Sequence, residues 1–174
     1  WDFMRSKIEN SGREIRVLNL FAYTGGATVA AAKAGASVVH VDASKGMVAQ
    51  AKENAALSGL ADAPIRYIVD DCRKFIEREI RRGNRYDGII MDPPSYGRGP
   101  SGEVRQLEDS IDDFVKLAAG VLSDDPLFFL VNSYTTGLSP LAMKYIIELR
   151  LKAFGGTAEA GEIALPVTFT DGLL

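Results

Sequence analysis

The sequence predicts an α/β fold, a mostly parallel sheet with helices on both faces. Short, nearly continuous apolar runs alternate along the chain with amphipathic or alanine-rich segments. Such runs are typical of strands that are buried on both faces of a sheet, and the alternation is typical of right-handed crossovers between parallel strands. No linker rich in Pro, Ser or Gly divides the chain. We therefore expect one domain over residues 1–174.

Five strands are predicted from apolar runs of four to eight residues, bounded by glycine, proline or polar residues. Pro64, for example, directly precedes the third run. The five runs are residues 15–21, 37–41, 65–69, 86–91 and 127–131. A weaker pattern over residues 163–169 predicts one more strand.

Five helices are predicted between and after these runs. Thr24-Gly25-Gly26 separates the first strand from an alanine-rich helix, and Ser44 is placed to cap the second helix. Phe75, Ile76 and Ile80 share one face of the third, and Pro140 precedes the last. The expected helices are residues 27–35, 44–58, 71–82, 109–121 and 141–154.

The composition excludes several classes of protein. The chain is 47% hydrophobic and 25% charged, with 20 Lys+Arg against 23 Asp+Glu, which is unlike a disordered or collagen-like chain. One cysteine and no long apolar run favour a soluble, cytoplasmic protein with no disulfide framework and no membrane span. The net charge of −3 argues against binding nucleic acid by bulk electrostatics alone. Because the chain opens on Trp1, we expect a piece of a longer protein whose N-terminal part is absent.

Ligands of open parallel sheets bind beyond the carboxyl ends of the strands, so the residues that follow each strand are the candidates for a site. After the first strand comes the segment 21–26, Phe-Ala-Tyr-Thr-Gly-Gly. Its glycines allow close approach of the backbone to a ligand, although a plain strand-to-helix turn explains them as well. Phe21 and Tyr23 fill the first two glycine places of the G-x-G-x-x-G turn that binds a pyrophosphate. A pyrophosphate ligand is therefore disfavoured.

Acidic residues follow the second and third strands. Asp42 is placed to accept both hydroxyls of a ribose, or else to act as a capping or surface aspartate. One carboxylate of Asp70-Asp71 is placed to accept from the amine of adenine, and a helix N-cap is an equally good explanation. We prefer Asp71 for the adenine.

The fourth predicted strand ends in a rigid group of hydrogen-bond acceptors, Asp92-Pro93-Pro94, with Tyr96 close behind. Two prolines fix the backbone and the direction of its carbonyl groups. Asp92 and a proline carbonyl suit a flat substrate that bears an amine, on which Tyr96 can stack. The alternative is a merely stiff loop. The long segment 93–106 continues with Arg98 and Arg105, which are candidates for contacts with nucleic-acid phosphates.

Three strings of residues carry a resemblance to a known family: residues 17–26 (Val-Leu-Asn-Leu-Phe-Ala-Tyr-Thr-Gly-Gly), residues 41–44 (Val-Asp-Ala-Ser) and Asp92-Pro93-Pro94. The chain resembles a class I S-adenosylmethionine-dependent methyltransferase with a Rossmann-like fold. More narrowly, residues 15–135 resemble the catalytic domain of bacterial large-subunit ribosomal RNA methyltransferases.

The resemblance implies S-adenosylmethionine (SAM) as cofactor and 23S ribosomal RNA as substrate. It implies that residues 19–25 line the methionine moiety, Asp42 holds the ribose and Asp71 the adenine amine, and that Asp92 faces the sulfonium and the substrate. The implied cofactor-binding set is Asn19, Phe21, Tyr23, Thr24, Gly25, Asp42, Ala43, Ser44, Asp71, Cys72 and Asp92. The implied catalytic set is Asp92, Pro93, Pro94 and Tyr96.

The chain departs from part of the family at the residues after the fifth predicted strand. Family members that methylate carbon 5 of cytosine use a cysteine there, where this chain has Asn-Ser-Tyr-Thr (132–135). Carbon 5 needs covalent activation of the ring, usually by a thiolate, so we expect a nitrogen or oxygen acceptor instead.

Two residues near the implied site have simpler explanations. Cys72, beside the expected adenine pocket, fits a small packing residue. His40 lies within a strand and fits a core residue better than a metal ligand, and no metal is implied.

Alternative functions remain open. A dehydrogenase that binds a dinucleotide would also use Asp42, but the missing glycine triplet counts against it. A catalytically silent module that binds nucleotide or RNA would not need the intact Asp-Pro-Pro cluster. A small molecule or a protein is an alternative methyl acceptor. The apolar faces of the last helix and strand are candidates for contact with a second copy in a homodimer.

Overall fold

A computed structural model describes residues 1–98, 104–135 and 137–163. Its centre is a parallel five-stranded sheet in the order β3-β2-β1-β4-β7. The strands are β1 (Arg16–Leu20), β2 (Ser37–Asp42), β3 (Ile65–Val69), β4 (Gly88–Met91) and β7 (Phe128–Val131). The predicted α/β class and the five predicted strands are confirmed, with small shifts at the strand ends.

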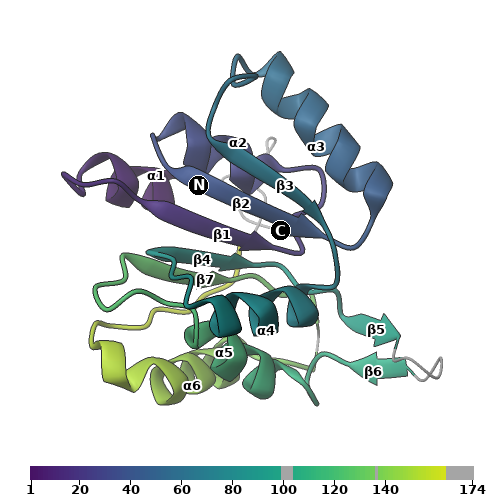
Figure 1. Ribbon diagram of the computed structural model, residues 1–174. Coiled ribbons are helices and arrows are strands. Elements are labelled where there is room, and N and C mark those ends of the chain that lie inside the picture. The colour runs from purple at the N-terminus through teal and green to yellow at the C-terminus, as the bar shows by residue number, and fades with distance from the viewer. Residues whose placement is uncertain (99–103, 136, 164–174) are drawn as a thin grey trace, which may run out of the picture.

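Helices cover both faces of the sheet, as Figure 1 shows. On one face lie α1 (Asp2–Glu9), α2 (Gly26–Lys33) and α3 (Lys45–Leu57). On the other lie α4 (Cys72–Arg82), α5 (Ile111–Ala119) and α6 (Pro140–Leu151), which continues into the 3₁₀ turn η1 (Lys152–Phe154). Each face has its own apolar core, one around Met4, Val17 and Ala31 and one around Leu18, Phe75 and Val115.

Capping residues begin and end several helices where the sequence places them. The Ser44 hydroxyl accepts from the Met47 N–H at 3.4 Å, and the Asp71 carboxylate accepts from the Lys74 N–H at 2.9 Å. Ser139 caps α6 in the same way, with Pro140 in its first turn. Gly83 ends α4 at φ +69°, a left-handed conformation that glycine adopts without steric cost.

The sequence prediction missed two features. Helix α1 buries only Met4 and Ile8, too few apolar positions to stand out as a pattern. The segment expected to be irregular contains a short antiparallel pair, β5 (Tyr96–Arg98) and β6 (Val104–Gln106). Of the strand expected over 163–169, residues 164–169 lie outside the described residues, as do the side chains of Arg98 and Arg105 that were expected to meet phosphates. No helix in the described segments combines the length and hydropathy needed to cross a membrane.

Gly88 is required by packing within the sheet. A Cβ atom at this position would lie 2.4, 2.6 and 2.9 Å from three ring carbons of Phe128. We expect Gly88→Ala to lower the free energy of unfolding by about 1–3 kcal/mol, because the buried ring has to shift in a packed core. Urea denaturation measures this loss. Gly161→Ala, which meets nothing within 4 Å, is the matched control, and an equal effect of both changes would contradict the steric explanation.

Candidate functional site

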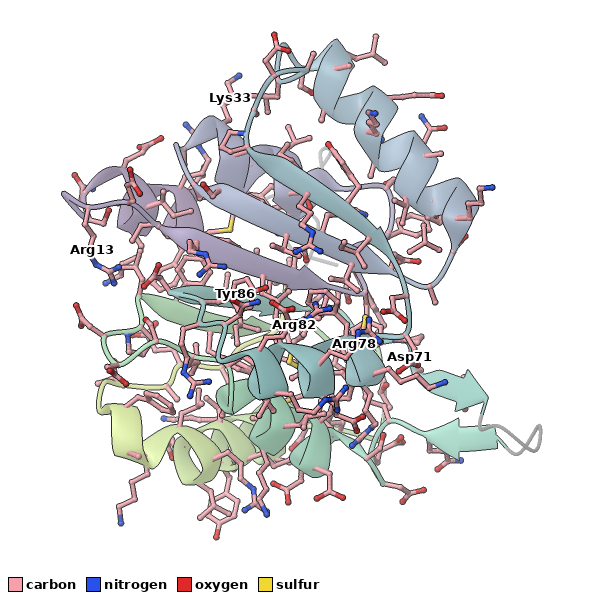
Figure 2. The ribbon with its side chains drawn as sticks, viewed as in Figure 1. Arg13, Lys33, Asp71, Arg78, Arg82 and Tyr86 are labelled. Atoms are coloured by element: carbon pink, nitrogen blue, oxygen red, sulfur yellow. The ribbon has the colours of Figure 1, made fainter. Side chains whose placement is uncertain are left out.

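The strand register brings the predicted site residues to one edge of the sheet. Leu20 pairs with Val41 on one side and with Met91 on the other, so Asp42 and Asp92 flank the end of β1. Asp42 in turn pairs with Val69, and this places Asp70 and Asp71 next along the edge. The strand order reverses between β1 and β4, which is where open α/β sheets bind their ligands. Asp71 is seen in Figure 2 at the start of α4 on this edge.

The loop between β1 and α2 is held in a strained conformation. Phe21 (φ +54°) and Tyr23 (φ +49°) adopt the left-handed region, which costs a residue other than glycine about 1–2 kcal/mol. They are the two residues that fill the glycine places of the pyrophosphate-binding turn. Two hydrogen bonds stabilise this conformation. The Phe21 N–H donates to Cys72 Sγ at 3.3 Å, and the Tyr23 N–H donates to Asp42 Oδ2 at 2.9 Å. Strain of this kind, held by surrounding contacts, is typical of functional loops.

Gly25 allows the loop to pack closely against α3. Its φ is +84°, and a Cβ atom there would lie 2.9 Å from Ala51 Cβ on α3. Asn54, also on α3, donates from Nδ2 to the carbonyl of Thr24 at 2.9 Å. The glycine therefore lets the loop close onto α3.

The carboxylate of Asp42 is fixed by two backbone donors. Oδ1 accepts from the Ser44 N–H at 2.8 Å, and Oδ2 accepts from the Tyr23 N–H at 2.9 Å. Each carboxylate oxygen has a second lone pair, so both remain able to accept from a neighbouring pair of hydroxyls. The half-buried side chain thus presents two oriented acceptors at the edge of the sheet. Ala43 and Ser44 beside it are exposed.

The two aspartates after β3 have different roles. Asp70 Oδ1 accepts from the Asp71 N–H, and its Oδ2 forms an ion pair with Arg78. Asp71 is exposed and caps α4 through Oδ1. The helix-cap explanation is therefore observed, and the same carboxylate keeps a second oxygen on the exposed side. This geometry favours Asp71 over Asp70 as a partner for a ligand.

Asp92 has a partner that sequence reasoning missed. Val131 at the end of β7 pairs with Met91, so Asn132 lies beside Asp92 and donates from Nδ2 to its Oδ1 at 3.2 Å. Burial raises the pKa of Asp92, and the hydrogen bond from Asn132 opposes this effect. The signal in the sequence was the position of Asn132 directly after a predicted strand. Next to Asp92, Pro93 is buried, whereas Pro94 and Tyr96 are exposed.

Asn19 and Cys72, two residues of the expected cofactor-binding set, are buried beneath the loop between β1 and α2. The amide of Asn19, 2% exposed, donates to Thr28 Oγ1 at 2.9 Å. Cys72 is 3% exposed, and its Sγ accepts a hydrogen bond from the Phe21 N–H. Burial raises the pKa of its thiol to about 12. Both residues hold the loop from beneath. The expectation that Cys72 is a packing residue is confirmed.

His40 continues the buried polar chain. Its Nδ1 hydrogen-bonds Thr28 Oγ1 at 2.9 Å, the ring is fully buried, and burial lowers its pKa to about 4. It is thus a core residue, as expected. In the described segments no three His, Cys, Asp or Glu side chains come together in a way that would hold a metal ion.

The pKa of His40 predicts an acid-sensitive stability. The unfolded chain, with a histidine pKa near 6.5, binds the proton more readily than the folded chain does. The free energy of unfolding is therefore expected to be highest above pH ~6.5 and to fall by about 3 kcal/mol as the pH decreases toward 4. Urea denaturation at a series of pH values measures the slope. We expect His40→Gln to flatten the slope, and equal slopes in both proteins would contradict the assignment.

The geometry fits an adenosine that bears no diphosphate. The Asp42 carboxylate after β2 is fixed and offers two acceptor oxygens, and the loop after β1 lacks the glycines that bind a pyrophosphate.

Comparison with known proteins agrees with this geometry. A family model described as S-adenosylmethionine-dependent methyltransferase matches residues 3–114. The chain belongs to this family. SAM is accordingly its cofactor, and the expected class I methyltransferase fold is confirmed.

Relatives of the methyltransferase include proteins named for ribosomal RNA. One from Shewanella baltica (strain OS195), named "Ribosomal RNA large subunit methyltransferase K/L", is 41% identical over 111 residues, 62% of this chain and 14% of that protein. A protein of the same name from Cellvibrio japonicus (strain Ueda107) is 38% identical over 110 residues, 63% of this chain and 14% of that protein. The chain thus spans about one seventh of the length of these curated relatives.

Solved structures show the same fold. The SAM-dependent methyltransferase from Agrobacterium tumefaciens is 43% identical, with a TM-score of 0.84 over 90% of this chain and 50% of that one. A second structure, described as "SMU.776, a putative methyltransferase complexed with SAH", is 28% identical, with a TM-score of 0.72 over 88% of this chain and 40% of that one.

Proposed function

We propose that this chain methylates a nitrogen or oxygen of an RNA base, such as one in 23S ribosomal RNA. The observation that carries the proposal is the pair Asp92 and Asn132, which sits where the strand order reverses and faces the same edge as Asp42. The names of the relatives support RNA as the acceptor.

The cofactor-binding residues in this proposal come from three strand ends. Asp42 accepts from the two ribose hydroxyls, and the free oxygen of Asp71 accepts from the adenine amine. Phe21, Tyr23 and Thr24 line the methionine moiety. Bound SAM supplies a methyl group on a sulfonium, which an electron-rich atom can take without metal or acid assistance.

The acceptor residues follow β4. Asp92 accepts a hydrogen bond from an N–H of the substrate, which aims the nitrogen lone pair and eases the positive charge that develops there. Asn132 holds the carboxylate in position for this contact. The rigid Pro93-Pro94 backbone adds carbonyl acceptors of fixed direction, and the exposed ring of Tyr96 stacks on the base.

A nitrogen or oxygen acceptor is favoured over carbon 5 of cytosine. That reaction needs a thiolate to attack the ring, and no cysteine follows β7, where residues 132–135 are Asn-Ser-Tyr-Thr. The single cysteine of the chain, Cys72, is buried with a pKa of about 12, so its thiol stays protonated near neutral pH.

Two measurements test the proposal. Calorimetry with SAM, its demethylated product and NAD is expected to show binding of the two sulfur compounds alone, and binding of NAD alone would indicate a dehydrogenase. Mass spectrometry of ribosomal RNA from cells that lack the gene is expected to show one missing methyl mark. An unchanged RNA profile together with normal SAM binding would replace the RNA base by a small molecule or a protein.

A further inference from the structure

The chain is acidic as a whole, but its positive charge is concentrated on one helix. Residues 72–85, which comprise α4 and the turn after it, contain six basic and two acidic residues. The other 160 residues contain fourteen basic and twenty-one acidic residues. A segment of charge +4 in a chain of charge −3 creates a local field that attracts anions.

Part of this charge is neutralised within the protein. Arg78 pairs with Asp70, and Arg82 pairs with Glu79, a buried carboxylate that also accepts from the Tyr86 hydroxyl at 2.6 Å. Figure 2 shows Arg78 and Arg82 along α4. These two arginines therefore contribute less to the external field.

Four basic residues of the segment remain, beside the exposed Glu77; one of them, Arg85, donates to the Gly120 carbonyl at 2.6 Å. In the described part of the chain, no carboxylate oxygen lies within 4 Å of a side-chain nitrogen of Arg73, Lys74 or Arg81, so none of the three forms an ion pair there. Lys74 and Arg81 are exposed on the outer side of the helix, and Arg73 is half-buried nearer its start. We refer to these three residues as the basic face.

A groove joins the basic face to α5. It has a volume of about 280 Å³, and it is lined by Arg73, Ile80, Asp113, Lys116, Leu117 and Gly120. The lining combines two cations, Arg73 and Lys116, with one carboxylate, Asp113, and with apolar surface from Ile80 and Leu117. The guanidinium carbon of Arg73 lies 5.5 Å from the centre of the Phe114 ring, which packs at 5.3 Å on the ring of Phe21 in the cofactor loop. Two packed aromatic rings therefore connect Arg73 at the groove with the loop of the candidate site.

We propose that the basic face and this groove dock the phosphate backbone of the RNA strand whose base enters the site. The inference rests on the proposed function. Helix α4 starts at the edge of the sheet that holds Asp42 and Asp92 and is about 15 Å long, so a strand that leaves the site along it passes Lys74 and then Arg81. Cations beside apolar and aromatic surface are the combination that binds single-stranded RNA.

Fluorescence anisotropy with a fluorescein-labelled 20-nucleotide oligouridylate tests this surface. Lys74→Gln with Arg81→Gln is expected to weaken binding about 10- to 30-fold near 0.1 M KCl and to reduce the slope of log K against log salt by about 1.4, because two phosphate contacts are lost. SAM affinity is expected to stay unchanged, since neither side chain belongs to the cofactor set. The matched control is Lys33→Gln with Lys52→Gln, two exposed lysines on α2 and α3 that cover the other face of the sheet; Lys33 is labelled in Figure 2.

Four outcomes would overturn the docking surface. They are unaltered RNA affinity in Lys74→Gln/Arg81→Gln, an equal loss in both double variants, no binding of the oligouridylate by the unaltered protein, and competition by polyglutamate as strong as that by RNA, which would make this an acidic-protein surface. The proposed function fails differently, through loss of SAM binding in the unaltered protein or an unchanged methylation profile of cellular RNA. Normal SAM binding with unaltered RNA affinity in Lys74→Gln/Arg81→Gln would refute the docking surface alone.

Discussion

Asp42→Ala is expected to weaken SAM binding by about 2–4 kcal/mol, or about 30- to 800-fold. The change removes both proposed ribose acceptors. It also removes the oxygen that accepts from the Tyr23 N–H, and with it one of the contacts that hold Tyr23 in the left-handed conformation. The affinity loss therefore combines a missing contact with a loosened loop. Isothermal titration calorimetry with SAM measures it.

Two further variants separate these effects. Asp42→Asn keeps one acceptor oxygen, so we expect an affinity between those of the unaltered protein and the alanine variant. Asp62→Ala changes an exposed aspartate before β3, at the opposite end of the strand from the site, and is expected to bind SAM normally. If Asp42→Ala binds SAM as tightly as Asp62→Ala does, Asp42 does not hold the ribose.

The strands and the site edge were predictable because their signals are local. Residues 65–69 form an apolar run between Pro64 and Asp70, and this run became β3 without a shift. Strand β4 was predicted two residues too early, because the regular ladder with β1 begins only at Gly88. Tyr86 and Asp87 are buried and still bond neighbouring segments: the Asp87 N–H donates to the Arg16 carbonyl and the Tyr86 N–H donates to the Val121 carbonyl, each at 2.8 Å. A sequence pattern does not mark where such flanking bonds give way to the ladder.

The supporting contacts of the site were not predictable, because they join residues far apart in sequence. Asp92 and Asn132 are forty positions apart, and they meet only because β4 and β7 are neighbours. The direction of the Asn19 side chain depends on Thr28 across the β1–α2 turn, so its place in a familiar string of residues did not reveal that its amide is buried and donates to Thr28. Sequence reasoning names the residues at a strand end, whereas packing decides which of them face outward.

Asp92→Asn is expected to lower the rate of methyl transfer by about 10²–10³-fold while SAM affinity stays within about threefold of normal. The amide replaces one acceptor oxygen by an N–H donor, so it no longer orients the substrate amine or balances the charge that develops on it. Single-turnover transfer from labelled SAM to ribosomal RNA measures the rate, and calorimetry measures the affinity. Glu108→Gln, at an exposed carboxylate before α5, is the control.

The dependence of the transfer rate on pH, at acidic pH, distinguishes a chemical role of Asp92 from a structural one. Because burial raises the pKa of Asp92, its ionised form is lost at a higher pH than that of an ordinary aspartate, and transfer is expected to decline as the pH falls through this raised pKa. Asn132→Ala removes the hydrogen bond that opposes the shift. The decline should then begin at a higher pH. A profile that does not move in Asn132→Ala would mean that the ionised Asp92 carboxylate takes no part in the transfer.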